Sequence, residues 1–117
     1  MVTNVQKDIK IINENGILAN CGGVTDSKEY SWGWRVWLDS CDTNGRIAQL
    51  SAGAALSTIA AALAALVSIP ASVAFGIAAG FMAFGAATLA YYNRTGCGIV
   101  TDYDPAGEVI TIKSQQC

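Results

Sequence analysis

The chain has 117 residues, of which 52% are hydrophobic and 14% charged, and its formal net charge is −2 at pH 7. This length predicts one domain, and the composition excludes a disordered, solvating chain. Seven Lys and Arg without a basic patch argue against a nucleic-acid partner. The absence of His removes the commonest general base and metal ligand.

The first part of the chain, residues 1–44, predicts a β-rich flank. One strand is predicted where residues 31–38 alternate with a period of two, placing Trp32, Trp34, Val36 and Leu38 on one side. We assign Trp32 and Trp34 to the core in preference to an exposed aromatic contact. Trp37 has the opposite parity and is the candidate for an exposed, membrane-interface contact. A second candidate strand covers residues 8–11.

The centre of the chain is its dominant feature, because no residue from Ile47 to Asn93 is charged. A bilayer-spanning helix needs about 20 apolar residues, so this block is long enough for two. Pro70 stands near its middle and favours a break there. We therefore predict helices over 45–67 and 71–92, with Thr43 or Asn44 as the first cap. Together they form an antiparallel helical hairpin over residues 45–92.

Each predicted helix has a bulky stripe and a seam of small side chains. The bulky residues, which we assign to membrane insertion, are Leu56, Ile59, Leu63, Leu66, Ile77, Phe81 and Phe84. The small residues, which we assign to the contact between the helices, include Ala54, Thr58, Ala61, Ala65, Gly76, Gly80, Ala83 and Ala87. Small seams let helices approach closely in lipid, and an Ala-rich core of a soluble protein is the alternative.

The end of the second predicted helix carries Tyr91, Tyr92 and Arg94, which are typical of an interfacial anchor or of simple helix termination. The last flank, residues 93–117, predicts a β-hairpin. Its strands are residues 98–103 and 109–112, and residues 104–107 between them have the chemistry of a turn.

Four cysteines, Cys21, Cys41, Cys97 and Cys117, are widely spaced and form no C-x-x-C pair. Their even number in a small chain predicts two disulfides and an oxidising compartment, with four free thiols as the alternative. A hairpin brings its outer ends together, so we predict the pairs Cys41–Cys97 and Cys21–Cys117. The pairing Cys21–Cys41 with Cys97–Cys117 remains the competing possibility.

The sequence contains almost no residues arranged for catalysis. Asp102 with Asp104 and Asp39 with Asp42 are the closest carboxylates beside turns, and such groups more often cap or face solvent than catalyse. We predict no catalytic residue, cofactor or metal.

The charge-free hairpin between Cys41 and Cys97 resembles the hydrophobic hairpin of pore-forming colicins. Its layout, with framing cysteines and Tyr-Tyr-Asn-Arg at the end, is similar to secreted bacteriocin or killer-toxin peptides. The resemblance implies insertion into a target-cell membrane, with possible homo-oligomers there. Because the chain is acidic, it also implies that a protein receptor or low pH brings the protein to the membrane.

We therefore expect a single α+β domain, with the helical hairpin packed against a small antiparallel sheet and stapled by disulfides. The expected function is a secreted toxin whose signal sequence has been removed. Two alternatives remain open: a small secreted binding or inhibitory protein that uses Trp37, Tyr103 and its turns, and a membrane immunity protein with two permanent spans.

Overall fold

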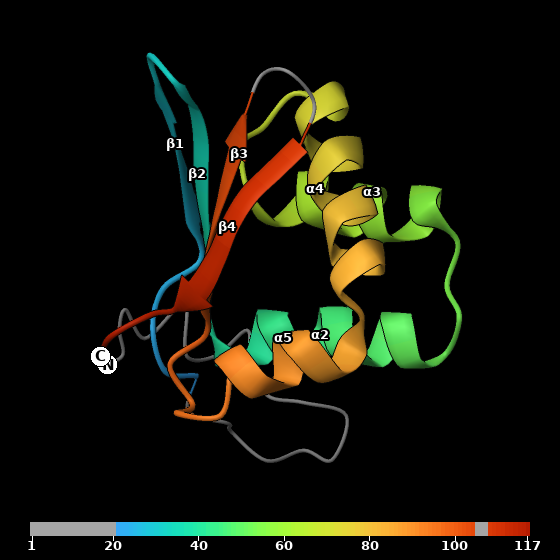
Figure 1. Ribbon diagram of the computed structural model, residues 1–117, viewed down its shortest axis with the longest axis vertical. Helices are drawn as coiled ribbons and strands as arrows, with labels where there is room; N and C mark the ends of the chain where they lie inside the picture. Colours follow the sequence, from blue (N-terminus) through green and yellow to red (C-terminus); the bar gives the residue numbers. More distant parts are fainter. Residues whose placement is uncertain (1–20, 105–107) are drawn as a thin grey trace.

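The computed structural model describes residues 21–104 and 108–117, and in this part of the chain it shows an α+β fold (Figure 1). The strands are β1 (Asp26–Tyr30), β2 (Gly33–Leu38), β3 (Ile99–Asp104) and β4 (Glu108–Ser114). They form one antiparallel sheet in the order β1-β2-β3-β4. The helices are α2 (Ser40–Ser51), α3 (Leu56–Leu66), α4 (Ala71–Phe84) and α5 (Ala86–Tyr92), and they lie on one side of the sheet. The α+β class is confirmed.

All of these helices are inserted between two strands that are neighbours in the sheet. Leu38 at the end of β2 pairs with Ile99 at the start of β3, so the chain leaves and re-enters the sheet at one place. Asn93 joins the two ends of the insertion, because its Nδ2 donates to Asn44 Oδ1 at 3.0 Å while its Oδ1 accepts from Gly98 N at 3.0 Å.

The core lies between the inner face of the sheet and the helices. The period of two in β2 buries Val36 and Leu38, and β3 adds Ile99 and Tyr103. The helices contribute their largest buried side chains to the same cluster, namely Ile59, Leu63, Ile77, Phe81 and Leu89. Each such side chain stabilises the fold by roughly 1.5–3 kcal/mol relative to exposure.

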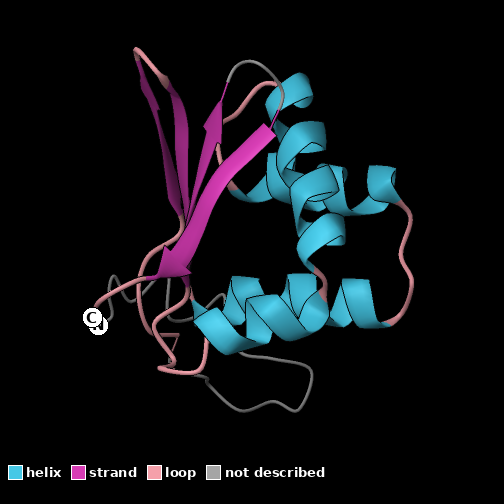
Figure 2. Cartoon of the chain, viewed as in Figure 1, coloured by secondary structure: helices cyan, strands magenta, loops and turns pink. Residues whose placement is uncertain are grey.

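The helices differ from the prediction in their continuity. Each of the two long helices that we expected is broken into two, after Ser51 and at Gly85. Both breaks contain a glycine with positive φ, 76° at Gly53 and 88° at Gly85, a conformation that ends an α-helix. The helices α4 and α5 meet at a bend of 96°, which is plain in Figure 2. As a result α3 packs against α4 and α2 packs against α5.

The first helix also begins earlier than predicted. Its cap is Asp39, whose Oδ1 accepts from Asp42 N at 2.8 Å, rather than Thr43 or Asn44. Those two residues lie inside α2, which begins at Ser40.

The strand predictions are confirmed for β2 and for the hairpin of β3 and β4, whereas β1 was missed. The sequence of β1, DSKEY, has no hydrophobic alternation and therefore gives no strand signal. The candidate strand over residues 8–11 lies outside the described residues, as do residues 105–107 of the predicted turn. Trp34 packs against the core, but Trp32 lies in the turn between β1 and β2 and is 39% exposed, so its core assignment is wrong.

Two disulfides are present, and they follow the competing pairing: Cys21–Cys41 and Cys97–Cys117. The predicted pairs Cys41–Cys97 and Cys21–Cys117 are wrong. The ends of the helical insertion do converge, as we expected, but each half-cystine bonds within its own flank. Gly22 and Ser40 exchange two hydrogen bonds, Gly22 N to Ser40 Oγ and Ser40 N to Gly22 O, which hold Cys21 beside α2. The hairpin of β3 and β4 likewise returns Cys117 to Cys97.

Candidate functional site

The residues predicted to insert into a membrane mostly belong to the core. Ile59, Leu63, Ile77 and Phe81 are fully buried. Leu56 and Leu66 are partly buried and pack against the same cluster, and Phe84 alone among the predicted residues is exposed. In the folded state the bulky stripe is therefore covered by protein, so contact of this stripe with lipid requires a rearrangement.

The predicted seam of small residues is not brought together between the helices. Thr58, Ala61, Ala65, Ala83 and Ala87 are exposed, whereas Ala54, Gly76 and Gly80 are partly buried. The alanines that are buried in the helices are Ala60, Ala74 and Ala78, which the sequence pattern did not single out.

Gly76 shows what one of the predicted seam residues does instead. A Cβ atom at this position would lie 2.2 Å from Cε1 of Tyr103 on β3. The missing side chain therefore lets α4 approach the sheet, so Gly76 serves the packing of a helix on the sheet rather than the packing of one helix on another.

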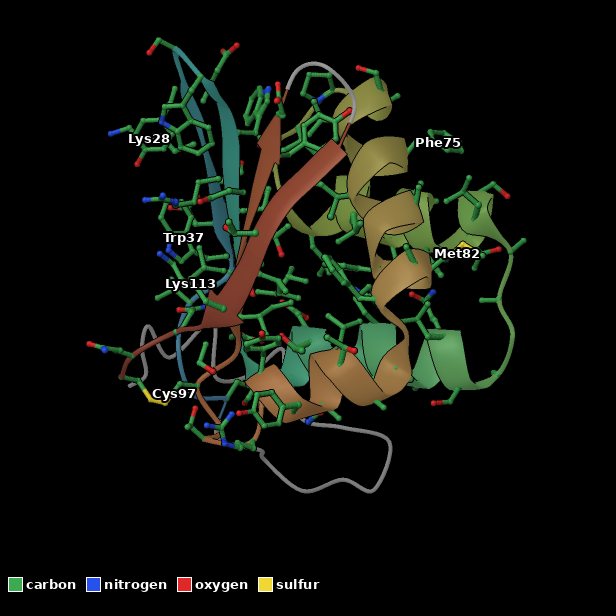
Figure 3. All side chains as sticks on the ribbon, viewed as in Figure 1. Lys28, Trp37, Phe75, Met82, Cys97 and Lys113 are labelled. Atoms are coloured by element: carbon green, nitrogen blue, oxygen red, sulfur yellow. A yellow bond between two sulfur atoms is a disulfide. The ribbon has the colours of Figure 1, made fainter. Side chains whose placement is uncertain are left out.

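An exposed, uncharged face runs along α4. Phe75 and Met82, two helical turns apart, are 44% and 46% exposed, and Ala79 lies exposed between them. Figure 3 shows Phe75 and Met82 pointing away from the sheet. We call Phe75, Ala79 and Met82 the α4 face. It can contact an apolar phase without desolvating a charge, because residues 47–93 contain none.

The predicted interfacial anchors lie in two different places. Tyr91 and Arg94 are exposed together at the end of α5, with the guanidinium 4.1 Å from the ring centroid. Tyr92 contacts Tyr91 edge-on and is partly buried against the core. Trp37 is partly buried and lies on the side of the sheet away from the helices (Figure 3). The four residues therefore do not form one belt.

The outer face of the sheet carries a cluster of aromatic and charged side chains. The density of aromatic residues in this stretch is visible in the sequence, but their contacts with Lys28 and Arg35 are not. The rings of Tyr30 and Trp32 stack with centroids 5.1 Å apart, and the Arg35 guanidinium lies 5.5 and 5.4 Å from them. Lys28 lies 5.4 Å from the Tyr30 ring. We call Tyr30, Trp32 and Arg35 the sheet cluster. The pairing of β1 with β2 brings Arg35 beside the Tyr30 ring. This contact could not be predicted because β1 itself was not predicted.

Arg35 also links three strands through Asp102. Its Nε and Nη2 donate to the two carboxylate oxygens of Asp102 at 2.7 and 3.1 Å, and Thr111 Oγ1 donates to Oδ2 at 3.2 Å. The hydrogen bonds from Arg35 hold the pKa of Asp102 below its usual value, although burial opposes them. Asp102, which we expected to face solvent or to cap a turn, thus connects β2, β3 and β4.

The described residues offer one group with the spacing of a metal site, formed by Cys21, Asp39 and Cys41. The two cysteines are bonded to each other and Asp39 caps α2, so these atoms are already engaged.

Over residues 21–104 and 108–117, no single helix is both long and apolar enough to cross a membrane. The helices α4 and α5 together have the required length and composition, but they are bent at Gly85. Comparisons with protein-family models, curated proteins and solved structures find no match to the chain.

Proposed function

We propose that the protein is a secreted, membrane-active toxin of the bacteriocin or killer-toxin kind. In this proposal the helices α2–α5 act as one folded-back hairpin that packs on the sheet in water and inserts into a target membrane. The observation that carries the proposal is the α4 face, where Phe75 and Met82 are exposed on a helix without charges. The two disulfides are compatible with secretion.

The free energy of insertion depends on whether lipid replaces water or protein around each side chain. Phe75 and Met82 are less than half exposed, so moving either side chain from the protein surface into hydrocarbon is favourable by roughly 1 kcal/mol. The buried residues Ile59, Leu63, Ile77 and Phe81 already lie in an apolar environment, so exchanging their protein neighbours for lipid changes their free energy little. The α4 face therefore starts the contact, and the core stripe follows it when the helices open.

Approach to the membrane needs a second factor, because a net charge of −2 gives no long-range attraction to anionic lipid. Acid is one such factor. Protonation of Asp102 removes the charged acceptor of Arg35 and weakens the connection between β2, β3 and β4. A protein receptor on the target cell is the other.

The test uses phosphatidylcholine vesicles, with and without phosphatidylglycerol, at pH 7 and at pH 3, because the lowered pKa of Asp102 keeps this carboxyl group charged at milder acidity. Binding is measured by flotation and permeabilisation by dye release, for the wild type, for Met82→Glu and for Ser31→Glu. The first variant places a charge on the α4 face and the second places the same charge in the exposed turn between β1 and β2. Losing the burial of Met82 and adding a charged carboxylate costs at least about 2 kcal/mol, so at pH 7, where the carboxylate is ionised, Met82→Glu should bind vesicles about 30-fold more weakly.

We expect Ser31→Glu to bind and to release dye as the wild type does. Absence of both binding and release for the wild type at both pH values would refute the membrane-active function. Equal losses in the two variants would show that net charge, and not the α4 face, controls binding.

The sheet cluster supports a second candidate function, a secreted binding protein. Trp32 is exposed although it stacks on Tyr30 and lies beside Arg35, an arrangement that suits a protein partner. This function predicts no vesicle binding. It also predicts that Trp32→Ala leaves the free energy of unfolding nearly unchanged while abolishing capture of the partner.

A further inference from the structure

The bend between α4 and α5 is formed by one residue, Gly85. Its backbone has φ 88° and ψ 163°, a combination that is essentially restricted to glycine. A Cβ atom built on Gly85 would meet no atom within 4 Å. Space is thus available for a side chain, and only the backbone conformation of the bend requires glycine.

Without the bend, the two helices have the dimensions of a membrane span. One continuous helix from Ala71 to Tyr92 would be about 33 Å long, against a hydrocarbon thickness of about 30 Å. No residue in it is charged.

Water and lipid favour different states of this segment. In water, α5 is held beside α2: Leu89 is buried, and Asn93, the residue after α5, donates to Asn44 Oδ1. Solvent can satisfy the backbone groups that the helix break leaves without an intrahelical partner. In hydrocarbon these groups have no such partner, so lipid favours a continuous helix.

We propose that Gly85 is a hinge that keeps α4 and α5 bent in water and straightens in a membrane, so that Ala71–Tyr92 becomes a transmembrane helix. The inference rests on the proposed membrane-active function and adds the conformational step that the function requires.

Straightening changes a distance that can be measured. For the exposed residues Ala71 and Ala90, helix geometry and the bend of 96° give about 22 Å between backbone positions, and a continuous helix gives about 29 Å. Spin labels carried by non-canonical amino acids at these positions, which leave the four cysteines intact, report the distance by double electron–electron resonance. The labelled full chain is measured in buffer and bound to vesicles of phosphatidylcholine and phosphatidylglycerol.

Gly85→Ala is the informative variant, because alanine strains the bent backbone and favours a helix. Gly45→Ala is the matched control: Gly45 lies within α2 with ordinary helical φ and with no atom within 4 Å of a built Cβ. At equal lipid concentration Gly85→Ala should increase the ratio of straight to bent molecules about five-fold or more, with a matching rise in dye release. Gly45→Ala should change neither.

For the wild type we expect the longer distance on vesicles and the shorter one in buffer. If the wild type binds vesicles and releases dye while the distance stays near 22 Å, the hinge is refuted and the membrane-active function survives. If the wild type neither binds nor releases dye, the proposed function fails and the hinge fails with it. The wild-type distances decide the matter even if Gly85→Ala does not fold.

Discussion

The pair formed by Arg35 and Asp102 predicts how the sheet responds to acid. Asp102→Asn removes the negative charge but keeps the shape of the side chain. A hydrogen bond to a charged group contributes roughly 1.5–3 kcal/mol, and screening by solvent lowers this, since the side chains of Arg35 and Asp102 are 31% and 13% exposed. We therefore expect Asp102→Asn to lower the free energy of unfolding by about 1–2 kcal/mol at pH 7.

The sign of the pH dependence follows from the lowered pKa of Asp102, for which the hydrogen bonds from Arg35 are the main cause. A carboxylate whose pKa is lower in the folded state stabilises the fold above its unfolded pKa of about 3.9. That stabilisation is lost as the pH falls through the lower, folded value. The difference between wild type and variant should thus be full at pH 7 and shrink as the pH drops below about 4.

Urea unfolding with the disulfides intact, followed by tryptophan fluorescence at several pH values from 7 to 2, measures this difference. Asp26→Asn is the control, because Asp26 is exposed on β1 and the amide oxygen of Asn can still accept from Ser27 N. A difference between wild type and Asp102→Asn that stays constant over the whole pH range would refute the reasoning, since it could not arise from the charge of Asp102.

Two further predictions concern the packing of the fold. The amide of Gln115 donates to the carbonyl oxygens of Val24, Leu38 and Ile99 and accepts from Val24 N. Gln115→Ala should therefore lower the free energy of unfolding by about 1–3 kcal/mol, while Gln116→Ala, at an exposed position, should leave the urea midpoint unchanged. Gly76→Ala forces a Cβ against the Tyr103 ring, whereas Gly45→Ala meets no atom. The first variant should be less stable than the second by about 1–3 kcal/mol in the same assay, and equal stabilities would show that Tyr103 yields freely.

The parts of the fold that were predictable are those with a contrast between polar and apolar residues. Val36 and Leu38 alternate with more polar neighbours, and the strands of the C-terminal hairpin are β-branched runs beside a proline and a glycine. Strand β1 has no such contrast, so it could only be found through its pairing with β2. The contact of Arg35 with the Tyr30 ring in the sheet cluster depends on that pairing, so it was missed together with β1.

The helices α3 and α4 show the opposite difficulty, because they contain no charged residue and Ala is their commonest residue. In such a segment composition predicts a helix but does not say which side of the helix is buried. Ala60 is buried and its neighbour Ala61 is exposed, and nothing in the sequence distinguishes them. Gly53 and Gly85 end helices, whereas Gly45 and Gly76 lie inside them. An isolated glycine is tolerated in a helix, so the breaks were not predictable one by one.

The observed disulfide pairing leaves the proposed hinge free to move. Cys41–Cys97 would have tied the two ends of the helical insertion to each other. The observed bonds instead attach the start of α2 to Cys21 and join Cys97, after α5, to Cys117, so each fixes one flank. The glycine breaks lie at the other ends of these helices, Gly53 after α2 and Gly85 before α5. Motion at Gly85 therefore requires no disulfide to break, and α4 can move while both cross-linked flanks keep their covalent bonds.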